Sequence, residues 1–331
     1  MQAWVNEKRA KRPVLADWPQ SGVGPGQIGV LLEATAIHPV DLETSKGDNA
    51  MMLAVSRPFV GGVDFVGTVA ELGAGVTDLS VGDRVYGYRG VPSQGAWAEQ
   101  LAVARSEVAR APDLPLEILA SLPLPALCAL QALDETGVSA GQTVLVQGGA
   151  GGVGSIAVQV FARRGLHVVA TAGGDDVQWV RALGAAEAID YRTTRFEDVA
   201  RDVDLLFDTV GGETLERSFQ VMKTGGAAVS LSAIPPVSRL VEAGMSVPAP
   251  LKLVLPLATW WKGRGARAAG VKFAGQVTVP SGARLDALTA MAQDEAVQAR
   301  VDRTFRWSEL DQAVEHVASG AARGRVVITR G

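Results

Sequence analysis

The amino-acid sequence predicts an α/β protein that combines a doubly wound parallel sheet with a β-rich, barrel-like domain. Three observations predict this architecture. A glycine-rich turn at 148–154 joins a strand-like run to a helix-like run. Strands then alternate with helices as far as residue 231. Residues up to 118 instead have the pattern of short strands punctuated by Gly and Pro.

The N-terminal part contains several strand-like runs and then one helix-like run. We expect strands at the following positions: 28–36, 67–72, 85–88 and 96–103. The pattern changes at 116–133, which is apolar and helical in spacing despite Pro123 and Pro125.

The middle part has the βαβα order of a parallel sheet. Strands are predicted at 144–147, 167–171, 187–190, 204–208 and 227–231, with helices at 153–164, 177–183 and 214–222 and a turn at 223–226. Because the carboxyl ends of parallel strands meet at one edge, we expect ligands to lie just beyond these ends.

The remaining segments are less regular. Residues 235–270 are expected to be irregular, as a lid or an oligomer contact, or alternatively a surface helix that packs the pair Trp260 and Trp261. Strands are expected at 271–279 and 325–329. The predicted division is a first domain part at 1–118, a nucleotide-binding domain at 119–278, and a return to the first domain at 279–331.

The turn at 148–154 carries the dinucleotide-binding spacing Gly149-x-Gly151-x-x-Gly154 between a strand and a helix. We expect Gly149 to permit the tight turn, Gly151 to let the backbone approach a pyrophosphate, and Gly154 to pack the helix closely on the strand. Ala150, Gly152 and Val153 complete the turn. The N-terminus of the helix would present free N–H groups and its positive dipole end to the phosphates.

Composition and charge exclude several other classes of protein. The net charge of −4 argues against binding to nucleic acid or to an anionic membrane surface. The first residues lack the apolar core of a signal peptide, and no run reaches the roughly 18 apolar residues that span a bilayer. The single cysteine excludes an internal disulfide and fits a cytoplasmic protein.

Several further motifs occur in the order found in one family. They are Ala36-Ile-His-Pro-Val-Asp41, Gly62-Val-Asp-Phe-Val-Gly-Thr-Val69, Val81-Gly-Asp-Arg-Val85, Gly95-Ala-Trp-Ala-Glu99, Leu124-Pro-Ala-Leu-Cys-Ala-Leu130, Gly148-Gly-Ala-Gly-Gly-Val-Gly154, Leu183-Gly-Ala185, Asp208-Thr-Val-Gly-Gly212 and Arg323-Gly-Arg-Val-Val327. With these motifs the chain resembles, nearly end to end, the medium-chain dehydrogenase/reductase superfamily, and in particular its zinc-independent quinone oxidoreductase branch.

The resemblance implies a Rossmann-type doubly wound sheet inserted into a GroES-like β-barrel catalytic domain, with the active site in the cleft. It also implies a homodimer, because relatives commonly pair strands across a dimer, and 271–279 is the corresponding run here. The motifs are specific for the branch and not for its substrate.

No zinc site is expected. The zinc-dependent branch carries Gly-His-Glu where this chain has Gly62-Val63-Asp64, and Cys128 is the only cysteine. An unusual site made of His38, Cys128 and Asp64 is the alternative. Hydride chemistry without a Lewis acid disfavours alcohol oxidation, because an alkoxide would lack stabilisation.

The second nucleotide-binding strand points to NADPH rather than NADH. NAD-specific sites place an acid about 20 residues beyond the glycines, whereas this strand ends in Thr171-Ala172-Gly173. That neutral end leaves room for a 2′-phosphate. Tyr191-Arg192 matches the Tyr-Arg pair that lies near this phosphate in the family, although the family's usual Lys is absent. Arg192 could also be a solvated surface charge.

Three residues are candidates for the reactive end, and three more for lining the coenzyme. His38 replaces the family's usual Asn and could donate a hydrogen bond or relay a proton. Cys128 stands where relatives usually carry Thr, or it is a small buried hydrophobe. Tyr88, with its neighbour Arg89, is expected to touch substrate. Backbone atoms at the following positions are expected to line the coenzyme: Val210, Leu231 and Ser232.

The function predicted from these features is an NADPH-dependent oxidoreductase that transfers hydride to a quinone or an α,β-unsaturated carbonyl compound. Two alternatives are a dedicated enoyl or polyketide-tailoring reductase and a non-catalytic NADPH-binding protein. The expected partners are a small-molecule substrate and a second copy of the chain, without nucleic acid or membrane.

Overall fold

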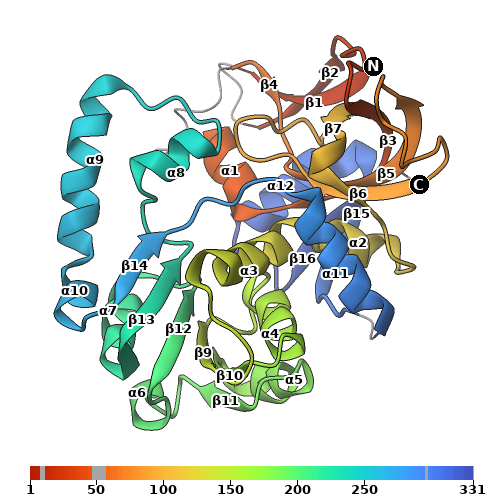
Figure 1. Cartoon of the computed structure of the whole chain (residues 1–331). Helices are drawn as coiled ribbons and strands as arrows, with labels where there is room; N and C mark the ends of the chain where they lie inside the picture. Colours follow the sequence, from red (N-terminus) through yellow and green to blue (C-terminus); the bar gives the residue numbers. More distant parts are fainter. Residues whose placement is uncertain (8–11, 47–56, 295–296, 331) are drawn as a thin grey trace. The chain divides into compact units, whose positions relative to one another are not determined.

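The computed structural model describes residues 1–7, 12–46, 57–294 and 297–330 (Figure 1). The chain divides into two compact units. Unit 1 comprises Met1–Leu127 and Val279–Gly331, and unit 2 comprises Cys128–Thr278. Among the described residues, no helix is long and apolar enough to cross a membrane.

Unit 2 is built on a six-stranded parallel sheet, which confirms the predicted Rossmann-type fold. Its order is β11-β10-β9-β12-β13-β14. The strands are β9 (Thr143–Gln147), β10 (His167–Ala172), β11 (Glu187–Asp190), β12 (Val203–Asp208), β13 (Met222–Ser230) and β14 (Lys272–Gly275). Helices α4 (Gly154–Arg163), α5 (Val177–Ala182), α6 (Phe196–Val199) and α7 (Gly212–Ser218) connect them. Continuous apolar runs such as Val144–Val146, with no exposed surface, suit strands that are covered on both faces.

The strand order reverses beside β9. The chain runs from β9 to β10 and β11 on one side, and then returns to place β12 on the other side of β9. The register pairs Gln147 with Asp208, so the carboxyl ends of β9 and β12 lie together. A reversal of this kind opens a crevice at the carboxyl edge of a parallel sheet.

Two predictions for unit 2 were wrong in detail. Residues 223–226, expected as a turn, belong to β13, where Gly225 has a φ of 86° and the register against β12 shifts. Glycines that favour a turn here make an irregular strand. The strand expected at 271–279 is limited to β14, at one edge of the sheet.

The segment 235–270 is helical, which agrees with the alternative of a surface helix and not with an irregular segment, although Trp260 and Trp261 are largely exposed. It forms α8 (Val237–Glu242), α9 (Ala249–Lys262) and α10 (Arg264–Ala268). Pro256 lies inside α9 and deprives the carbonyl of Lys252 of its usual partner, but Lys252 is exposed, so water can replace that bond. The prolines of this segment favoured a loop in the sequence. However, Pro248 is the N-cap of α9 and Pro250 lies in its first turn, where a proline is tolerated because the backbone N–H has no partner within the helix.

Unit 1 consists of two sheets. The three-stranded sheet has the order β2-β1-β4, and the larger one has the order β15-β16-β3-β5-β6-β8 with β7 paired to β3. Their strands are β1 (Gln2–Asn6), β2 (Val14–Asp17), β3 (Gln27–Ile37), β4 (Phe59–Val60), β5 (Asp64–Leu72), β6 (Arg84–Tyr88), β7 (Gln100–Ala104), β8 (Val108–Arg110), β15 (Val301–Arg306) and β16 (Arg325–Thr329). The C-terminal β16 pairs antiparallel with β3, which explains why the tail belongs to this unit.

Helices complete unit 1. They are α1 (Pro39–Lys46), α2 (Leu116–Ser121), α11 (Gly282–Asp294) and α12 (Leu310–Ala318). The single helix expected at 116–133 is two helices, because Pro123 begins a new one, α3 (Pro123–Thr136), which crosses the boundary between the units. The strand expected from residue 96 begins only at Gln100, since the Ala96 and Trp97 amides bond to the carbonyls of Gly62 and Gly61.

Gly67 in the centre of β5 shows how closely the strands of unit 1 pack. A Cβ added there would lie 2.1 Å from the Leu31 carbonyl oxygen of β3, whereas a Cβ at Gly22 would meet nothing within 4 Å. We expect Gly67→Ala to lower the free energy of unfolding by more than about 2 kcal/mol and Gly22→Ala to change it by less than about 0.5 kcal/mol. Urea denaturation followed by circular dichroism measures both; equal midpoints would contradict the packing described here.

Candidate functional site

The glycine-rich turn between β9 and α4 is tied to the neighbouring strand β10. The Gly149 amide donates to the Thr171 carbonyl at 2.8 Å, and the Gly148 amide donates to the Thr171 hydroxyl oxygen at 3.1 Å. That hydroxyl donates in turn to the side-chain carbonyl of Gln147 at 2.7 Å. Gln147 and Thr171 are both buried, so the turn is fixed from beneath by an internal hydrogen-bond chain.

The glycines of the turn have distinct roles. Gly149 was predicted to permit the tight turn, and the left-handed backbone of the turn lies one residue earlier, at Gly148, whose φ is 78°. At Gly149, an added Cβ would lie 2.9 Å from the Cβ of Ala170. At Gly154 it would lie 2.1 Å from the Gly148 carbonyl oxygen, so this glycine lets the first turn of α4 approach the loop. At Gly151 an added Cβ would meet only the Gly148 carbonyl oxygen, at 3.1 Å.

A cavity of about 810 Å³ opens at this edge of the sheet, entirely within unit 2. It lies beyond the carboxyl ends of β9, β10, β11 and β12, where the strand order predicts a ligand crevice. Seven of the predicted coenzyme residues line it: Ala150, Gly151, Thr171, Gly173, Tyr191, Arg192 and Val210. Because α4 begins without a side-chain cap, the start of this helix can receive an anion.

Six other predicted coenzyme residues do not line this cavity: Gly149, Gly152, Val153, Gly154, Leu231 and Ser232. The last two belong to a loop held by Asp208 at the end of β12. The Asp208 carboxylate accepts the Gly211 amide at 2.9 Å and the Ser230 hydroxyl at 2.6 Å, and Ser230 accepts the Ser232 amide. Asp208 therefore fixes two adjacent loops from a fully buried position.

The charges that line the cavity are mainly positive. Arg192, Arg195 and Arg217 face one acid, Asp176. Arg217 donates two hydrogen bonds to Glu197, and this guanidinium lowers the pKa of Glu197 to about 2. Sequence analysis missed Arg195 and Arg217, which stand on the loop before α6 and on α7. No motif marks them, and only the fold turns them toward the cavity.

Arg192 differs from Arg217 in its surroundings. Its guanidinium lies 3.1–3.3 Å from the position of a Cβ on Gly173, so it covers the end of β10. Within the described ranges, no carboxylate lies at ion-pair distance from it. A planar cation of this kind beside a neutral strand end is suited to a phosphate.

The predicted catalytic residues His38 and Tyr88 lie in unit 1 and are buried. The His38 ring stands between Asp64 and Arg325: Nε2 is 2.8 Å from Asp64 Oδ2, at salt-bridge distance though without hydrogen-bond geometry. The Arg325 guanidinium donates to Nδ1 at 2.9 Å. Because arginine can only donate, Nδ1 must be an acceptor, which makes His38 the neutral Nε2–H tautomer. Tyr88 is paired with Asp64 across β5 and β6.

Burial and charge shift the pKa values of this cluster. Desolvation lowers the pKa of His38, and the attraction of Asp64 opposes the shift. Desolvation also raises the pKa of Asp41 to about 8, although its carboxylate accepts the His38 backbone amide at 2.8 Å. Asp64 accepts the Leu124 amide at the start of α3, where the helix dipole favours an anion.

The described residues do not fit a zinc ion. Among them, no group of three or more His, Cys, Asp and Glu is placed to hold a metal. Cys128, in unit 2, is 3 % exposed and its Sγ lies 3.0 Å from Thr278 Oγ1. His167 and His316 lie within 3.4 Å and 2.7 Å of Glu187 and Asp302, respectively.

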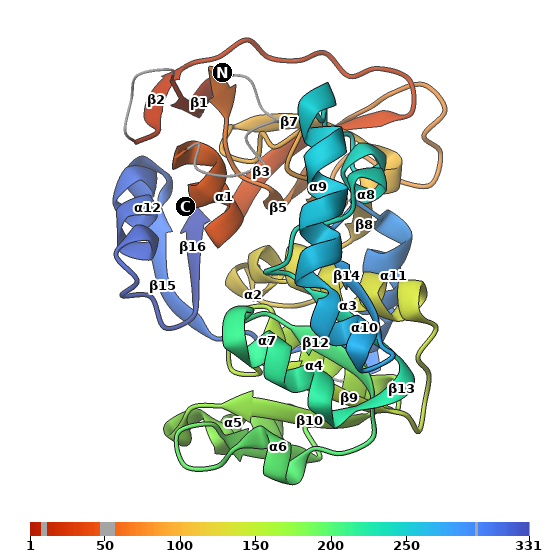
Figure 2. The ribbon, with the colours of Figure 1, turned by 90° about the vertical axis from the view of Figure 1, so that its left-hand side faces the viewer.

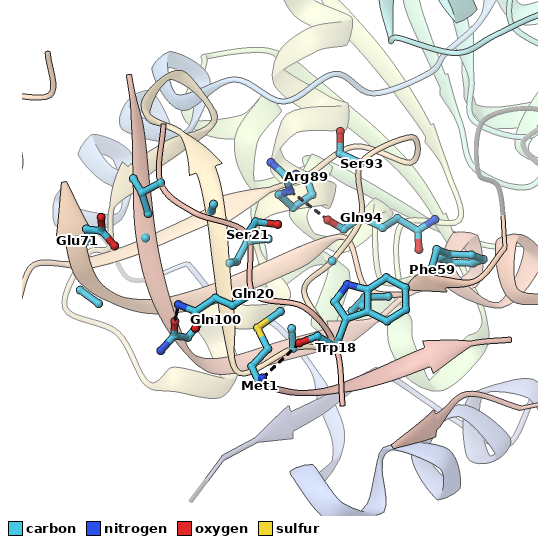
Figure 3. A pocket seen from close by; sticks show the side chains of 18 of the residues that line it. Met1, Trp18, Gln20, Ser21, Phe59, Glu71, Arg89, Ser93, Gln94 and Gln100 are labelled. Atoms are coloured by element: carbon cyan, nitrogen blue, oxygen red, sulfur yellow. Dashed lines mark hydrogen bonds between the residues drawn. The ribbon is translucent and has the colours of Figure 1, made fainter. Parts of the chain in front are cut away.

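A second cavity, of about 340 Å³, lies in unit 1 (Figure 3). Arg89 borders it, but its guanidinium is bound to Glu107 at 2.9 Å and to the Gln94 carbonyl at 3.1 Å. Figure 3 shows the second of these bonds, together with the bond from the Met1 amine to the Trp18 carbonyl. Lined largely by amides, hydroxyls and apolar groups, this cavity lacks the glycine turn of the first.

Two family models match the chain. One, described as zinc-binding dehydrogenase, matches residues 183–328, and the other, described as alcohol dehydrogenase GroES-like domain, matches residues 24–113. Among named relatives, the NAD(P)H oxidoreductase RTN4IP1, mitochondrial, of Danio rerio is 29 % identical over 99 % of this chain and 91 % of its own length. The NADPH-dependent alkenal/one oxidoreductase, chloroplastic, of Arabidopsis thaliana is 34 % identical over 65 % of this chain and 58 % of its own.

Two solved structures are similar to this chain over its whole length. The quinone oxidoreductase of Coxiella burnetii is 27 % identical with a TM-score of 0.81, covering 100 % of this chain and 99 % of that one. An alcohol dehydrogenase superfamily protein of Novosphingobium aromaticivorans is 32 % identical with a TM-score of 0.80, covering both chains completely. The chain therefore belongs to the medium-chain dehydrogenase/reductase superfamily, among its quinone oxidoreductase-like and alkenal reductase-like members.

Proposed function

We propose that the protein transfers hydride from NADPH to a quinone or an α,β-unsaturated carbonyl compound without zinc. The superfamily to which the chain belongs supports an NAD(P)H-dependent oxidoreductase. The preference for NADPH is supported by the cavity at the carboxyl edge of the unit 2 sheet, where a glycine turn adjoins a cluster of arginines.

The residues of this cavity fit a dinucleotide phosphate. Gly151 and Ala150 would let the pyrophosphate approach the backbone, since no side chain projects from Gly151. Arg192 would pair with the 2′-phosphate over Gly173, and Arg195 adds a second cation nearby. The bound coenzyme would supply the hydride, while the protein holds the ring and the acceptor carbon in register.

Catalytic roles stay predictions for His38, Tyr88 and Cys128. Burial supports a positioning role for His38, because both ring nitrogens already face Asp64 and Arg325. Its lowered pKa keeps the ring neutral near pH 7, so His38 is not an imidazolium that could protonate the product, and its remaining Nε2–H faces Asp64. Protonation of the product would then fall to water or to a neutral donor such as the Tyr88 hydroxyl.

The proposal also covers the roles of the two domains, the oligomeric state and the location of the protein. We propose that 1–118 and 279–331 bind the acceptor and that 119–278 binds the coenzyme. The homodimer, the absence of zinc and the cytoplasmic location also stay predictions. Relatives named as mitochondrial and chloroplastic leave the compartment open.

An acceptor screen tests the reaction. Purified protein is mixed with NADPH and a panel of quinones, enones and enoyl thioesters, and absorbance of the reduced coenzyme is followed. We expect turnover with at least one quinone or enone. Turnover with thioesters alone would select a dedicated enoyl reductase, and coenzyme binding without turnover would select a non-catalytic role.

Arg192→Ala tests the preference for NADPH. Because a charge-assisted pair with a phosphate contributes about 1.5–3 kcal/mol, we expect the Kd for NADPH to rise roughly ten- to a hundredfold. The Kd for NADH should change less than about twofold. Arg181→Ala, an exposed site on α5, is the matched control for calorimetry. The pairing is wrong if both coenzymes weaken equally.

Asp41→Asn tests the protonation of the buried cluster. The pKa of Asp41 is raised to about 8 in the folded protein. At pH values below about 8 and above the unfolded pKa, the folded state therefore binds one proton more than the unfolded state. Stability therefore falls as pH rises through that value, and we expect a loss of about 1 kcal/mol between pH 7 and 9. The lowered pKa of His38 makes stability rise with pH, but this rise is complete above the unfolded pKa of about 6.5 and does not affect the range from pH 7 to 9.

The Asn variant should lose this pH dependence, whereas Glu7→Gln, a change at an exposed carboxylate, should retain it. Urea unfolding at several pH values gives the comparison. A wild-type stability that rises from pH 7 to 9 would contradict a neutral Asp41.

A further inference from the structure

Helix α9 of unit 2 carries an exposed apolar stripe. Its members are largely accessible: Leu253 (81 %), Val254 (58 %), Leu257 (68 %), Trp260 (59 %) and Trp261 (60 %). They recur at spacings of three and four residues and so share one face, while Leu255 is the only buried residue of the helix. The helix stands at the periphery of unit 2 in Figure 1 and faces the viewer in Figure 2.

The segment around α9 is basic although the whole chain has a net charge of −4. Residues 243–278 contain no Asp or Glu and five cations: Lys252, Lys262, Arg264, Arg267 and Lys272. All five are exposed. Within the part of the chain that is described, none of them forms an ion pair.

The two tryptophans connect the apolar stripe with the cations. The Arg264 guanidinium lies 4.4 Å from the centre of the Trp261 ring, and that of Arg267 lies 4.6 Å from the Trp260 ring. Such pairs put an amphipathic ring next to a positive charge at one end of the helix, the arrangement that suits the boundary between lipid tails and headgroups.

We propose that α9 docks the protein on an anionic phospholipid surface, with the stripe in the acyl boundary and Arg264 and Arg267, which lie against its two tryptophans, among the headgroups. With 14 residues, or roughly 21 Å, α9 is too short to span a bilayer and would lie in its plane. Net charge argued against an anionic membrane, but attraction over about 10 Å is governed by the local patch.

Two other possible partners match the apolar stripe and the cations of this surface less completely. A second copy placed symmetrically on α9 would bring the same uncompensated cations face to face. A nucleic acid would match the cations and leave the apolar stripe in water. Lipid with anionic headgroups matches both features.

Vesicle co-sedimentation of the full-length protein tests the proposal. The vesicles consist of phosphatidylcholine alone or mixed with phosphatidylglycerol. We expect at least roughly tenfold stronger partitioning onto the mixed vesicles, falling as NaCl is raised. Leu257→Glu should abolish it, whereas Val81→Glu, at a residue of unit 1 that is 64 % exposed, should not. Arg264→Gln, which removes the cation beside Trp261, should weaken binding to mixed vesicles more than Arg181→Gln at an exposed site on α5.

Several results would overturn the proposal. They are equal binding to both kinds of vesicle, no binding at all, or a wild-type dimer that Leu257→Glu converts to a monomer without an effect on vesicles. Light scattering gives the oligomeric state. NADPH oxidation by Leu257→Glu in solution should equal that of the wild type, so a failure of this proposal leaves the proposed function intact.

Discussion

The hydrogen-bond chain from Gln147 through Thr171 to the Gly148 amide is the constraint on which the coenzyme site depends. It joins the ends of two neighbouring strands to the first residue of the glycine turn. Gln147 also donates to Ser218 on α7, so the chain is anchored on a third element. Because these groups are buried and satisfied, the turn can hold its amides in place before any ligand arrives.

Charge is distributed unevenly over the chain, and this distribution says more about partners than the net value does. Arg192 and Arg195 stand at the cavity, whereas the buried cluster in unit 1 sets two carboxyl groups and a histidine around Arg325. The first arrangement suits an external anion. The second compensates its own charges, in part by keeping Asp41 protonated, and so serves to fix the backbone near His38.

The sequence predicted the positions of the first five strands of unit 2 along the chain, because each strand has an apolar run closed by Gly or a polar residue. It also predicted seven residues of the cavity, since the glycine motif and the strand ends mark them directly. For 235–270 the sequence left an irregular segment and a surface helix as alternatives, because Pro256 disfavours a helix; α9 is that helix, with Trp260 and Trp261 largely exposed. Arg195 and Arg217 were not predicted, and the role of Asp208 in fixing two loops was not foreseen. These roles arise from positions that only the folded sheet brings together.

The central claim is that the edge of the unit 2 sheet binds a nicotinamide coenzyme through its phosphates. Amide hydrogen exchange with and without saturating NADPH tests this most directly. We expect slower exchange in 148–154 and 190–195, and little change in β15 and α12. Unchanged exchange in the glycine turn, or protection confined to another region, would contradict it.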